Sequence, residues 1–153
     1  MNDVYLLLGS NIEPEKHVKL ALQSLHDSEL LEVVNISSIW QTKAVGASAP
    51  DFLNVAVNIQ TTCELHCLKE IVLGEIEENL GRVRTVDKNA PRTIDLDVIV
   101  FNNQIVDKEV FIQDHVMLPM AELLPDLYSE DHGCTLLKLS ADRLKQTLAK
   151  KIL

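Results

Sequence analysis

A strict alternation of side-chain type runs through Leu53-Asn54-Val55-Ala56-Val57-Asn58-Ile59. Large aliphatic residues take the odd positions, and amides or alanine take the even positions, which is the period of a β-strand whose successive side chains point to opposite faces. The pattern predicts a half-buried strand. Residues 31–40 are rich in β-branched side chains and predict a second strand, which could pair with the first across an expected loop at 42–51.

The other elements flank these two strands. In chain order, the patterns predict a strand at 4–8 that ends in the turn Gly9-Ser10-Asn11, a helix of roughly three turns from Pro14, a helix over 64–80 that stops at Gly81, and a strand over 93–101 with a tight turn after it. A last amphipathic stretch covers 136–148. The order β-α-β-β-α-β predicts an α+β fold of the split βαβ type, an antiparallel sheet with two helices on one face, followed by a C-terminal helical appendage.

Size and composition place the chain among ordinary globular proteins. It has 153 residues, of which 46% are hydrophobic and 24% are charged, so a single domain over 1–153 is expected and wholesale disorder is not. No apolar run approaches the ~20 residues of a membrane-spanning helix, and the first residues lack the basic region of a signal peptide. These features predict a cytoplasmic protein. Nothing in the sequence demands an oligomer, so a monomer is expected.

The charge of the chain is strongly acidic but locally reversed. A formal net charge of -9 repels nucleic-acid backbones and anionic lipid, so neither is expected as a general partner. Three of the four arginines, Arg82, Arg84 and Arg92, nevertheless fall within eleven residues. The forked guanidinium group matches phosphate and carboxylate oxygens, which indicates a bound anion. A solvated basic loop that pairs with nearby acids explains the composition equally well.

Two acidic residues share one face of the strand that follows these arginines. In Ile94-Asp95-Leu96-Asp97-Val98 the apolar side chains point one way and both carboxylates the other. Two residues along a strand span about 6.6–6.8 Å, so the two charges repel unless a cation lies beside them. Oxygen ligands favour Mg²⁺ or Mn²⁺ over Zn²⁺. The alternative is an edge strand whose acids simply face water.

The position of this acidic pair favours the metal hypothesis. Arg92 lies three residues before Asp95, so groups that hold a cation stand next to groups that hold anions. That combination is what magnesium–nucleotide chemistry requires, because the cation neutralises phosphate charge and the arginines stabilise the leaving group. The sequence lacks a Gly-x-x-x-x-Gly-Lys-[Ser/Thr] phosphate loop.

The same residues resemble those of a known family. Gly81-Arg82-Val83-Arg84 and Ala90-Pro91-Arg92-Thr93-Ile94-Asp95-Leu96-Asp97-Val98-Ile99 are similar to segments of 6-hydroxymethyl-7,8-dihydropterin pyrophosphokinases, enzymes of folate biosynthesis. The resemblance extends to Gly9-Ser10-Asn11, to residues 42–46 and to Pro50-Asp51-Phe52-Leu53-Asn54, and it spans roughly residues 3 to 127. It implies a ferredoxin-like fold, which agrees with the element order above.

The resemblance also implies a reaction and a site. The reaction is the Mg²⁺-dependent transfer of a pyrophosphoryl group from ATP to the hydroxymethyl oxygen of the pterin, which releases AMP. By their positions, Asp95 and Asp97 would bind two Mg²⁺ ions and Arg82 and Arg92 would bind phosphates. Further expected contacts are Glu77, Arg84 and His115 on the ATP side and Thr42, Val45, Phe52 and Asn54 on the pterin side. No general base stands out.

The chain departs from the family pattern after His115. Several residues are missing before Leu118-Pro119, including an aromatic residue that would face Phe52 across the pterin and an arginine that would close over ATP. A tryptophan is also missing between Arg84 and Pro91. An active pyrophosphokinase is the favoured hypothesis. The alternatives are a nucleotide- or pterin-binding paralogue that is non-catalytic or takes an altered substrate, and an unrelated phosphate-binding domain of the same fold.

Overall fold

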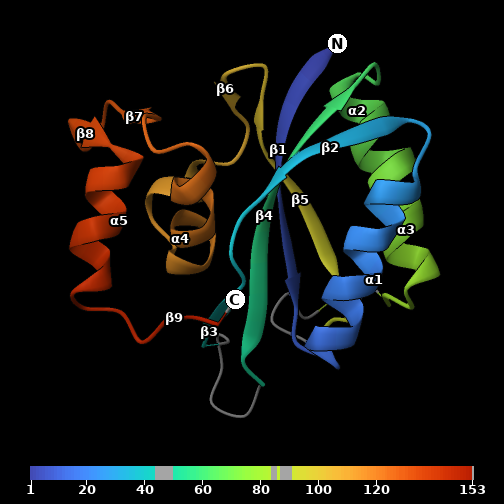
Figure 1. Cartoon of the computed structure of the whole chain (residues 1–153), viewed down its shortest axis with the longest axis horizontal. Coiled ribbons are helices and arrows are strands. Elements are labelled where there is room, and N and C mark those ends of the chain that lie inside the picture. The colour runs from blue at the N-terminus through green and yellow to red at the C-terminus, as the bar shows by residue number, and fades with distance from the viewer. Residues whose placement is uncertain (44–49, 84–85, 87–90, 153) are drawn as a thin grey trace.

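A seven-stranded antiparallel sheet forms the centre of the molecule (Figure 1). The computed structural model describes residues 1–43, 50–83, 86 and 91–152. Within them, the strands of this sheet are β1 (Asn2–Ser10), β2 (Leu31–Ile36), β3 (Trp40–Thr42), β4 (Phe52–Thr61), β5 (Asp95–Phe101), β6 (Gln104–Ile105) and β9 (Lys150–Lys151). Their order is β6-β5-β1-β4-β3-β9, and β2 also pairs with β4. A small second sheet joins β7 (Tyr128–Ser129) to β8 (Cys134–Thr135).

Helices cover both faces of the central sheet (Figure 1). One face carries α1 (Pro14–Asp27) and a continuous helical segment made of α2 (Leu65–Cys67), a π-helical part at Leu68–Leu73 and α3 (Gly74–Asn79). The other face carries α4 (Asp114–Leu123), and α5 (Leu136–Leu144) lies outside α4. A 3₁₀ turn at Lys108–Phe111 leads from the β5–β6 hairpin into α4. No helix in the described part of the chain is both long and apolar enough to cross a membrane.

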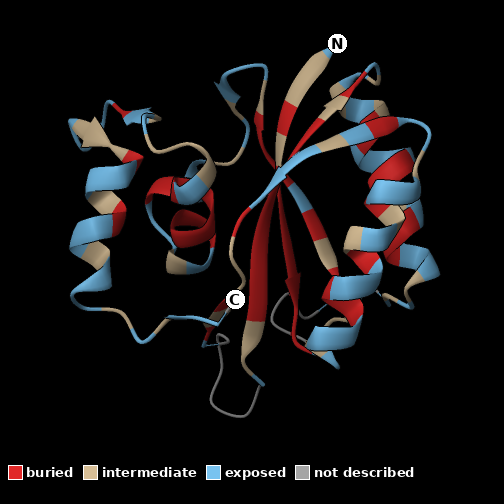
Figure 2. Ribbon diagram, in the orientation of Figure 1, coloured by how far each residue is buried: buried red, intermediate tan, exposed pale blue. Residues whose placement is uncertain are grey.

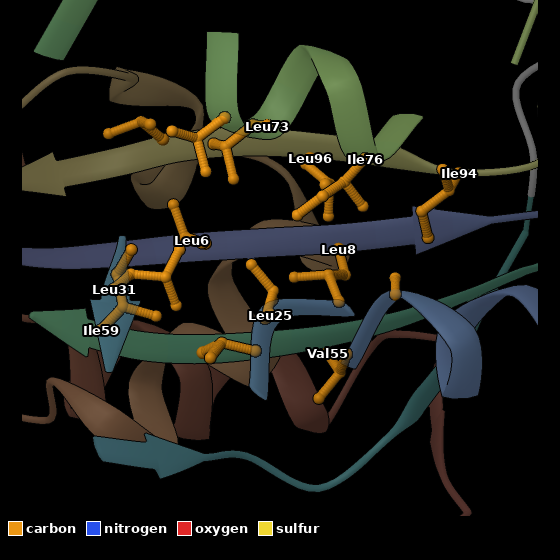
Figure 3. Packing of buried hydrophobic residues seen from close by; sticks show 14 of the residues in the cluster. Leu6, Leu8, Leu25, Leu31, Val55, Ile59, Leu73, Ile76, Ile94 and Leu96 are labelled. Atoms are coloured by element: carbon orange, nitrogen blue, oxygen red, sulfur yellow. The ribbon is translucent and has the colours of Figure 1, made fainter. Parts of the chain in front are cut away.

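The larger core lies between the sheet and the first helical layer (Figure 3). Leu6 and Leu8 of β1 and Ile59 of β4 are completely buried there against Leu25 of α1 and Leu73 of the π-helical part. Each fully buried side chain of this kind contributes about 1.5–3 kcal/mol to the free energy of unfolding. This packing fixes the positions of β1, β4 and β5, and therefore of the side chains that they carry on the opposite face.

The predicted α+β fold class, element order and antiparallel pairing are confirmed. Gly81 ends α3 as expected, with a φ of 85°. Two predictions about strands are wrong. The strand at 52–61 is buried on both faces rather than half-buried, because α4 packs against the face that carries Ala56 (Figure 2). The expected single strand over 31–40 is two strands, because Ser37 forms hydrogen bonds with the Ala56 backbone between them.

Two predictions about helices also need correction. The helix expected over 64–80 contains a six-residue π-helical part, which a simple 3.6-residue period does not reveal and which is frequent near functional sites. The C-terminal helix ends at Leu144 rather than Leu148, and the chain then continues as an extended tail to β9. The C-terminal region is therefore more than an appendage. Its helix α4 covers the second face of the sheet, and α5 packs on the outside of α4. The expected loop at 42–51 falls largely outside the described residues.

Candidate active site

Four residues lie in one row across four strands on the α4 side of the sheet. Trp40 of β3 pairs with Asn54 of β4, Asn54 pairs with Gly9 of β1, and Gly9 pairs with Asp95 of β5. Residues that pair across antiparallel strands project from the same face. Because Gly9 has no side chain, the row contains a gap between the Asn54 amide and the Asp95 carboxylate.

The two aspartates of β5 project together, as predicted. Leu96, between them, is buried in the core, whereas Asp95 is half-buried and Asp97 is exposed. Both predicted phosphate-binding arginines contact Asp95: Arg82 Nη1 lies 2.6 Å from Oδ1, and Arg92 Nη1 lies 3.0 Å from Oδ2. The structure therefore places the arginines and the carboxylate pair in one site, which is the juxtaposition on which the sequence hypothesis depends.

Glu77 holds this cluster to the sheet. Its Oε2 accepts hydrogen bonds from Arg82 Nη1 at 2.8 Å and from the Leu96 backbone N–H at 2.8 Å. In the described part of the sheet, β6 pairs only with residues 100–101 of β5, so no neighbouring strand accepts a hydrogen bond from the Leu96 N–H. The Glu77 carboxylate accepts this hydrogen bond instead. Burial works against the charge of Arg82, but Asp95 and Glu77 outweigh that effect and raise the pKa of Arg82.

A cleft of about 930 Å³ opens along this edge of β5. Asp95, Leu96 and Asp97 line one side, and Glu77 and Arg82 line another. The remaining wall comes from the π-helical part and α3, through Lys69, Glu70, Ile71, Gly74, Glu75 and Glu78. The cleft is large enough to hold a molecule of nucleotide size.

Asp97 has several carboxylates close to it. Although the side chain of Asp97 reaches solvent, the surrounding protein partly desolvates its carboxylate, and this desolvation, together with the carboxylates of Asp95, Glu77 and Asp107, raises the pKa of Asp97 to about 7 against the opposing effect of Arg82. A cation would relieve this repulsion, and the carboxylate oxygens of Asp95 and Asp97 are the donors that Mg²⁺ prefers. The described residues thus offer two carboxylates of the type that Mg²⁺ prefers, although both Asp95 oxygens contact arginines and the described residues contain no group of three or more such ligands.

The predicted pterin-side residues lie across Gly9 from the carboxylates. Asn54 Nδ2 donates a 2.7 Å hydrogen bond to the Thr42 hydroxyl, and both residues are buried. The Arg92 guanidinium carbon lies 5.8 Å from the centre of the Phe52 ring, which places a phosphate-side cation against a pterin-side aromatic ring. A Cβ atom on Gly9 would sit 3.1 Å from Asn54 Oδ1, so glycine keeps this gap open.

Of the three remaining predicted residues, His115, Val45 and Arg84, the structure describes only His115. His115 lies in the first turn of α4, and it is not among the described residues that line the cleft. Desolvation lowers the pKa of His115, while Asp107, Asp114, Glu109 and Asp95 act in the opposite direction, so His115 is within electrostatic reach of Asp95. Val45 and Arg84 lie outside the described residues.

Two residues of the site were not assigned a role from the sequence. Gly9 provides the gap, and Asn11 fixes the backbone of Arg92, because its Oδ1 accepts from the Arg92 N–H at 2.8 Å and its own N–H donates to the Arg92 carbonyl at 3.2 Å. Asn11 Nδ2 also donates to the Pro50 carbonyl at 3.4 Å. A Gly-Ser-Asn turn is a common strand ending, and only the register of the sheet shows what these two positions do.

Comparison with known proteins decides the family. The model of the 7,8-dihydro-6-hydroxymethylpterin-pyrophosphokinase family matches residues 5–125, which include both aspartates, both arginines and Asn54. The chain belongs to this family. Membership confirms the predicted family and the predicted enzyme class, an ATP-dependent pyrophosphokinase.

Individual relatives of this pyrophosphokinase cover nearly the same length. The 2-amino-4-hydroxy-6-hydroxymethyldihydropteridine pyrophosphokinase of Bacillus subtilis is 36% identical over 141 residues, which are 85% of this chain and 83% of the relative. The protein of the same name from Methylorubrum extorquens is 38% identical over 138 residues, 83% of this chain and 85% of the relative. Identity of this level over most of both chains supports the family assignment independently of the short motifs.

Solved structures agree with the fold. A crystal structure of Plasmodium falciparum HPPK-DHPS superposes with a TM-score of 0.72 over 95% of this chain at 11% sequence identity. The pyrophosphokinase chain spans 46% of that longer protein. At this identity the likeness concerns the fold alone, and it confirms the α+β architecture with an antiparallel sheet and flanking helices.

Proposed function

We propose that Asp95, Asp97, Arg82 and Arg92 form the active site in which this pyrophosphokinase carries out the reaction of its family. That reaction transfers a pyrophosphoryl group from ATP to the hydroxymethyl oxygen of 6-hydroxymethyl-7,8-dihydropterin in folate biosynthesis. The observation that carries the assignment is the shared site of the four side chains, since both arginines contact the same Asp95 carboxylate. Scattered surface residues would not be arranged in this way.

The ATP side of the site consists of charged groups. Asp95 and Asp97 are the proposed ligands of two Mg²⁺ ions, which when bound would neutralise charge on the phosphate oxygens. Arg82 and Arg92 each carry guanidinium donors next to that position and are suited to phosphate oxygens. Glu77 keeps Arg82 in place and is a positioning residue. His115 and Arg84 complete the proposed ATP side.

The pterin side consists of a ring and two buried polar groups. Phe52 offers a face for stacking. Because Asn54 Nδ2 is engaged by Thr42, its Oδ1 faces the space above Gly9, where it can accept a hydrogen bond from a donor on the pterin edge. Val45 completes the proposed pterin side. Two interstrand spacings, about 10 Å in all, separate the strands of Asn54 and Asp95, so one substrate can reach both sides.

The products of a simple assay test this function. The chain is incubated with ATP, Mg²⁺ and 6-hydroxymethyl-7,8-dihydropterin, and nucleotides are separated by chromatography, with a control that omits the pterin. We expect AMP and the pterin diphosphate in equal amounts, and no ADP. Tight binding of ATP without AMP formation would contradict the proposal and favour the non-catalytic binding protein.

The same proposal includes the cellular location, the domain organisation and the oligomeric state of the protein. We propose a cytoplasmic location for the reaction, in keeping with the acidic net charge of -9. Both hydrophobic cores lie against the same central sheet, one on each face, which supports one domain over 1–153. We also propose that the protein acts as a monomer, the state expected from its sequence.

Replacing Gly9 with alanine is expected to raise the KM for the pterin by about tenfold, because the new methyl group would fill the gap beside Asn54 Oδ1. The dissociation constant for ATP should change little, since Asp97 and the wall of the cleft are untouched. Steady-state kinetics with each substrate varied in turn measures both. Gly74→Ala is a control, because its added methyl would meet only an ordinary 3.5 Å contact with the Lys69 carbonyl. Equal effects of the two variants on the pterin KM would contradict the role of Gly9.

Binding of Mg²⁺ should depend on pH near neutrality. The pKa of Asp97 is raised to about 7, so a proton competes with the metal below that pH. We expect Mg²⁺ to bind about tenfold more tightly at about pH 8 than at about pH 6, and Asp97→Asn to abolish most of this dependence. Calorimetric titration at several pH values measures it.

The same raised pKa affects stability without metal. Between the ordinary value of 3.8 and about 7, the folded protein retains a proton on Asp97 that the unfolded chain has released. The contribution of Asp97 to the free energy of unfolding therefore falls as the pH rises through this window. Mg²⁺ should reverse this fall, and thermal melts with and without Mg²⁺ check the sign.

A further inference from the structure

The C-terminal tail runs from α5, the outer helix, to the central sheet beside β3 (Figure 1). After α5 the chain runs to β9, which pairs antiparallel with β3 through Lys151 opposite Trp40 and Lys150 opposite Gln41. The Ile152 N–H then donates a 2.8 Å hydrogen bond to the Ile39 carbonyl. The last described residues are therefore part of the central sheet.

The beginning of the tail is fixed at Asp114, the first residue of α4. Arg143 Nη1 lies 2.6 Å from Asp114 Oδ1 and 3.0 Å from the Ile112 carbonyl oxygen. The Thr147 hydroxyl donates to the other carboxylate oxygen of Asp114. The tail is thus held at both ends, by α4 at one and by β3 at the other.

β3 is a short strand whose last residue belongs to the proposed pterin side. It has only three residues, and β4 pairs with it on one side while β9 pairs with it on the other. Without β9, this three-residue strand would have one open edge and would fray easily, because few hydrogen bonds would hold it. Thr42, its last residue, accepts the hydrogen bond that sets the orientation of the Asn54 amide.

Side chains of the tail also reach Thr42. A cavity of about 280 Å³ lies beside this residue, and Leu148 and Lys150 of the tail line it together with Gln41, Lys43 and Asp51. Gln41 and Asp51 are linked by a 3.1 Å hydrogen bond across the base of the intervening loop. Tail and β3 therefore share a wall next to the pterin side, in addition to their backbone pairing.

We propose that the C-terminal segment 147–152 is a positioning element for the pterin: β9 holds β3 against β4, and β3 holds the Thr42 hydroxyl that orients the Asn54 amide. The inference rests on the proposed function, since it assigns the pterin to Thr42 and Asn54. The residues of the tail that pair with β3 contact the sheet rather than the reacting atoms, so they are positioning residues. Loss of the tail should weaken pterin binding and leave the ATP side intact.

Two substitutions at one position test the pairing. Ile152→Pro removes the side chain and the N–H that binds the Ile39 carbonyl, whereas Ile152→Ala removes the side chain and keeps the N–H. We expect Ile152→Pro to raise the pterin KM about fivefold and Ile152→Ala to change it less than about twofold. A chain that ends at Ala149 lacks β9 and should raise the pterin KM about tenfold or more. The ATP dissociation constant and kcat at saturation should stay within about twofold in all three.

The outcomes that would overturn the proposal are specific. An unchanged pterin KM in the chain that ends at Ala149 would show that β9 does not position the site. Equal effects of Ile152→Pro and Ile152→Ala would assign the effect to the side chain. Parallel losses of ATP and pterin affinity would indicate general loosening of the fold.

A spectroscopic measurement separates this proposal from the proposed function. In ¹⁵N-labelled protein without substrates, the side-chain amide signal of Asn54 should shift in Ile152→Pro and stay in place in Ile152→Ala, because it reports the hydrogen bond to Thr42. An unmoved Asn54 signal in Ile152→Pro would overturn the positioning role even if the enzyme is active. Absence of AMP with the unaltered chain would instead refute the proposed function, while a shifted signal would still support the link from β9 to Asn54.

Discussion

Asp97→Asn should leave a folded protein whose turnover is lower by about a thousandfold or more, because the substitution keeps the size of the side chain and removes one of the two proposed Mg²⁺-binding carboxylates. The side chain of Asp97 is exposed on β5, and no ion pair from the described residues reaches it, so the core loses no contact. Removal of a charge from a crowded acidic cluster should also raise the melting temperature slightly. Single-turnover measurements at saturating ATP give the rate, and thermal melts report the fold.

Glu75→Gln is the matched control for this prediction. Glu75 lines the same cleft and its substitution removes the same charge, but it lies on α3 and not in the carboxylate pair. If Asp97 acted only through the net charge of the cleft, the two variants would lose similar amounts of activity. We expect Glu75→Gln to keep activity within about threefold. Normal turnover in Asp97→Asn would refute the metal assignment.

Glu77→Ala should lower the free energy of unfolding by about 3 kcal/mol, because it leaves a largely buried Arg82 without one of its two carboxylates and the Leu96 N–H without its acceptor. For a chain of this size that corresponds to a fall in melting temperature of roughly 6–12 °C. Activity should fall as well, since the edge of β5 that carries Asp95 loses its tie to α3. Chemical denaturation followed by the fluorescence of Trp40 measures the stability.

Glu77→Gln separates the two roles of this side chain. The amide oxygen of glutamine can still accept from the Leu96 N–H, but it carries no charge to offset that of Arg82. We expect about half of the destabilisation seen with alanine. Equal stability of the alanine variant and the unaltered protein would show that Glu77 does not hold β5 to α3. Equal destabilisation by both substitutions would assign the whole effect to the charge.

The sequence was sufficient for the architecture and for the centre of the site. The hydrophobic patterns give β1, α1, β4, α3 and β5 in their correct order, although the alternation at 53–59 indicates one buried face where the structure has two. The adjacency of Asp95, Asp97 and Arg92 is local in sequence, and the two-residue period of a strand is enough to place both carboxylates on one face.

Features that depend on the pairing of strands far apart in the chain could not be predicted from the sequence. Gly9 is important because β4 and β5 place Asn54 and Asp95 on either side of it, and this register involves residues more than forty positions away. The bond from Glu77 to the Leu96 N–H exists because β6 stops short of that edge. The same holds for β9, since nothing in Lys150-Lys151 indicates that this pair joins the sheet beside β3.

Locating the bound metal ion directly tests whether Asp95 and Asp97 hold it. Mn²⁺, which binds similar oxygen ligands, broadens the NMR signals of nearby amides, so ¹⁵N-labelled protein is titrated with Mn²⁺ in the presence of a non-hydrolysable ATP analogue. We expect the amide signals of Asp95, Leu96 and Asp97, and of Gly9 beside them in the sheet, to disappear before those of α5. Broadening that spares β5 and gathers elsewhere would contradict this expectation.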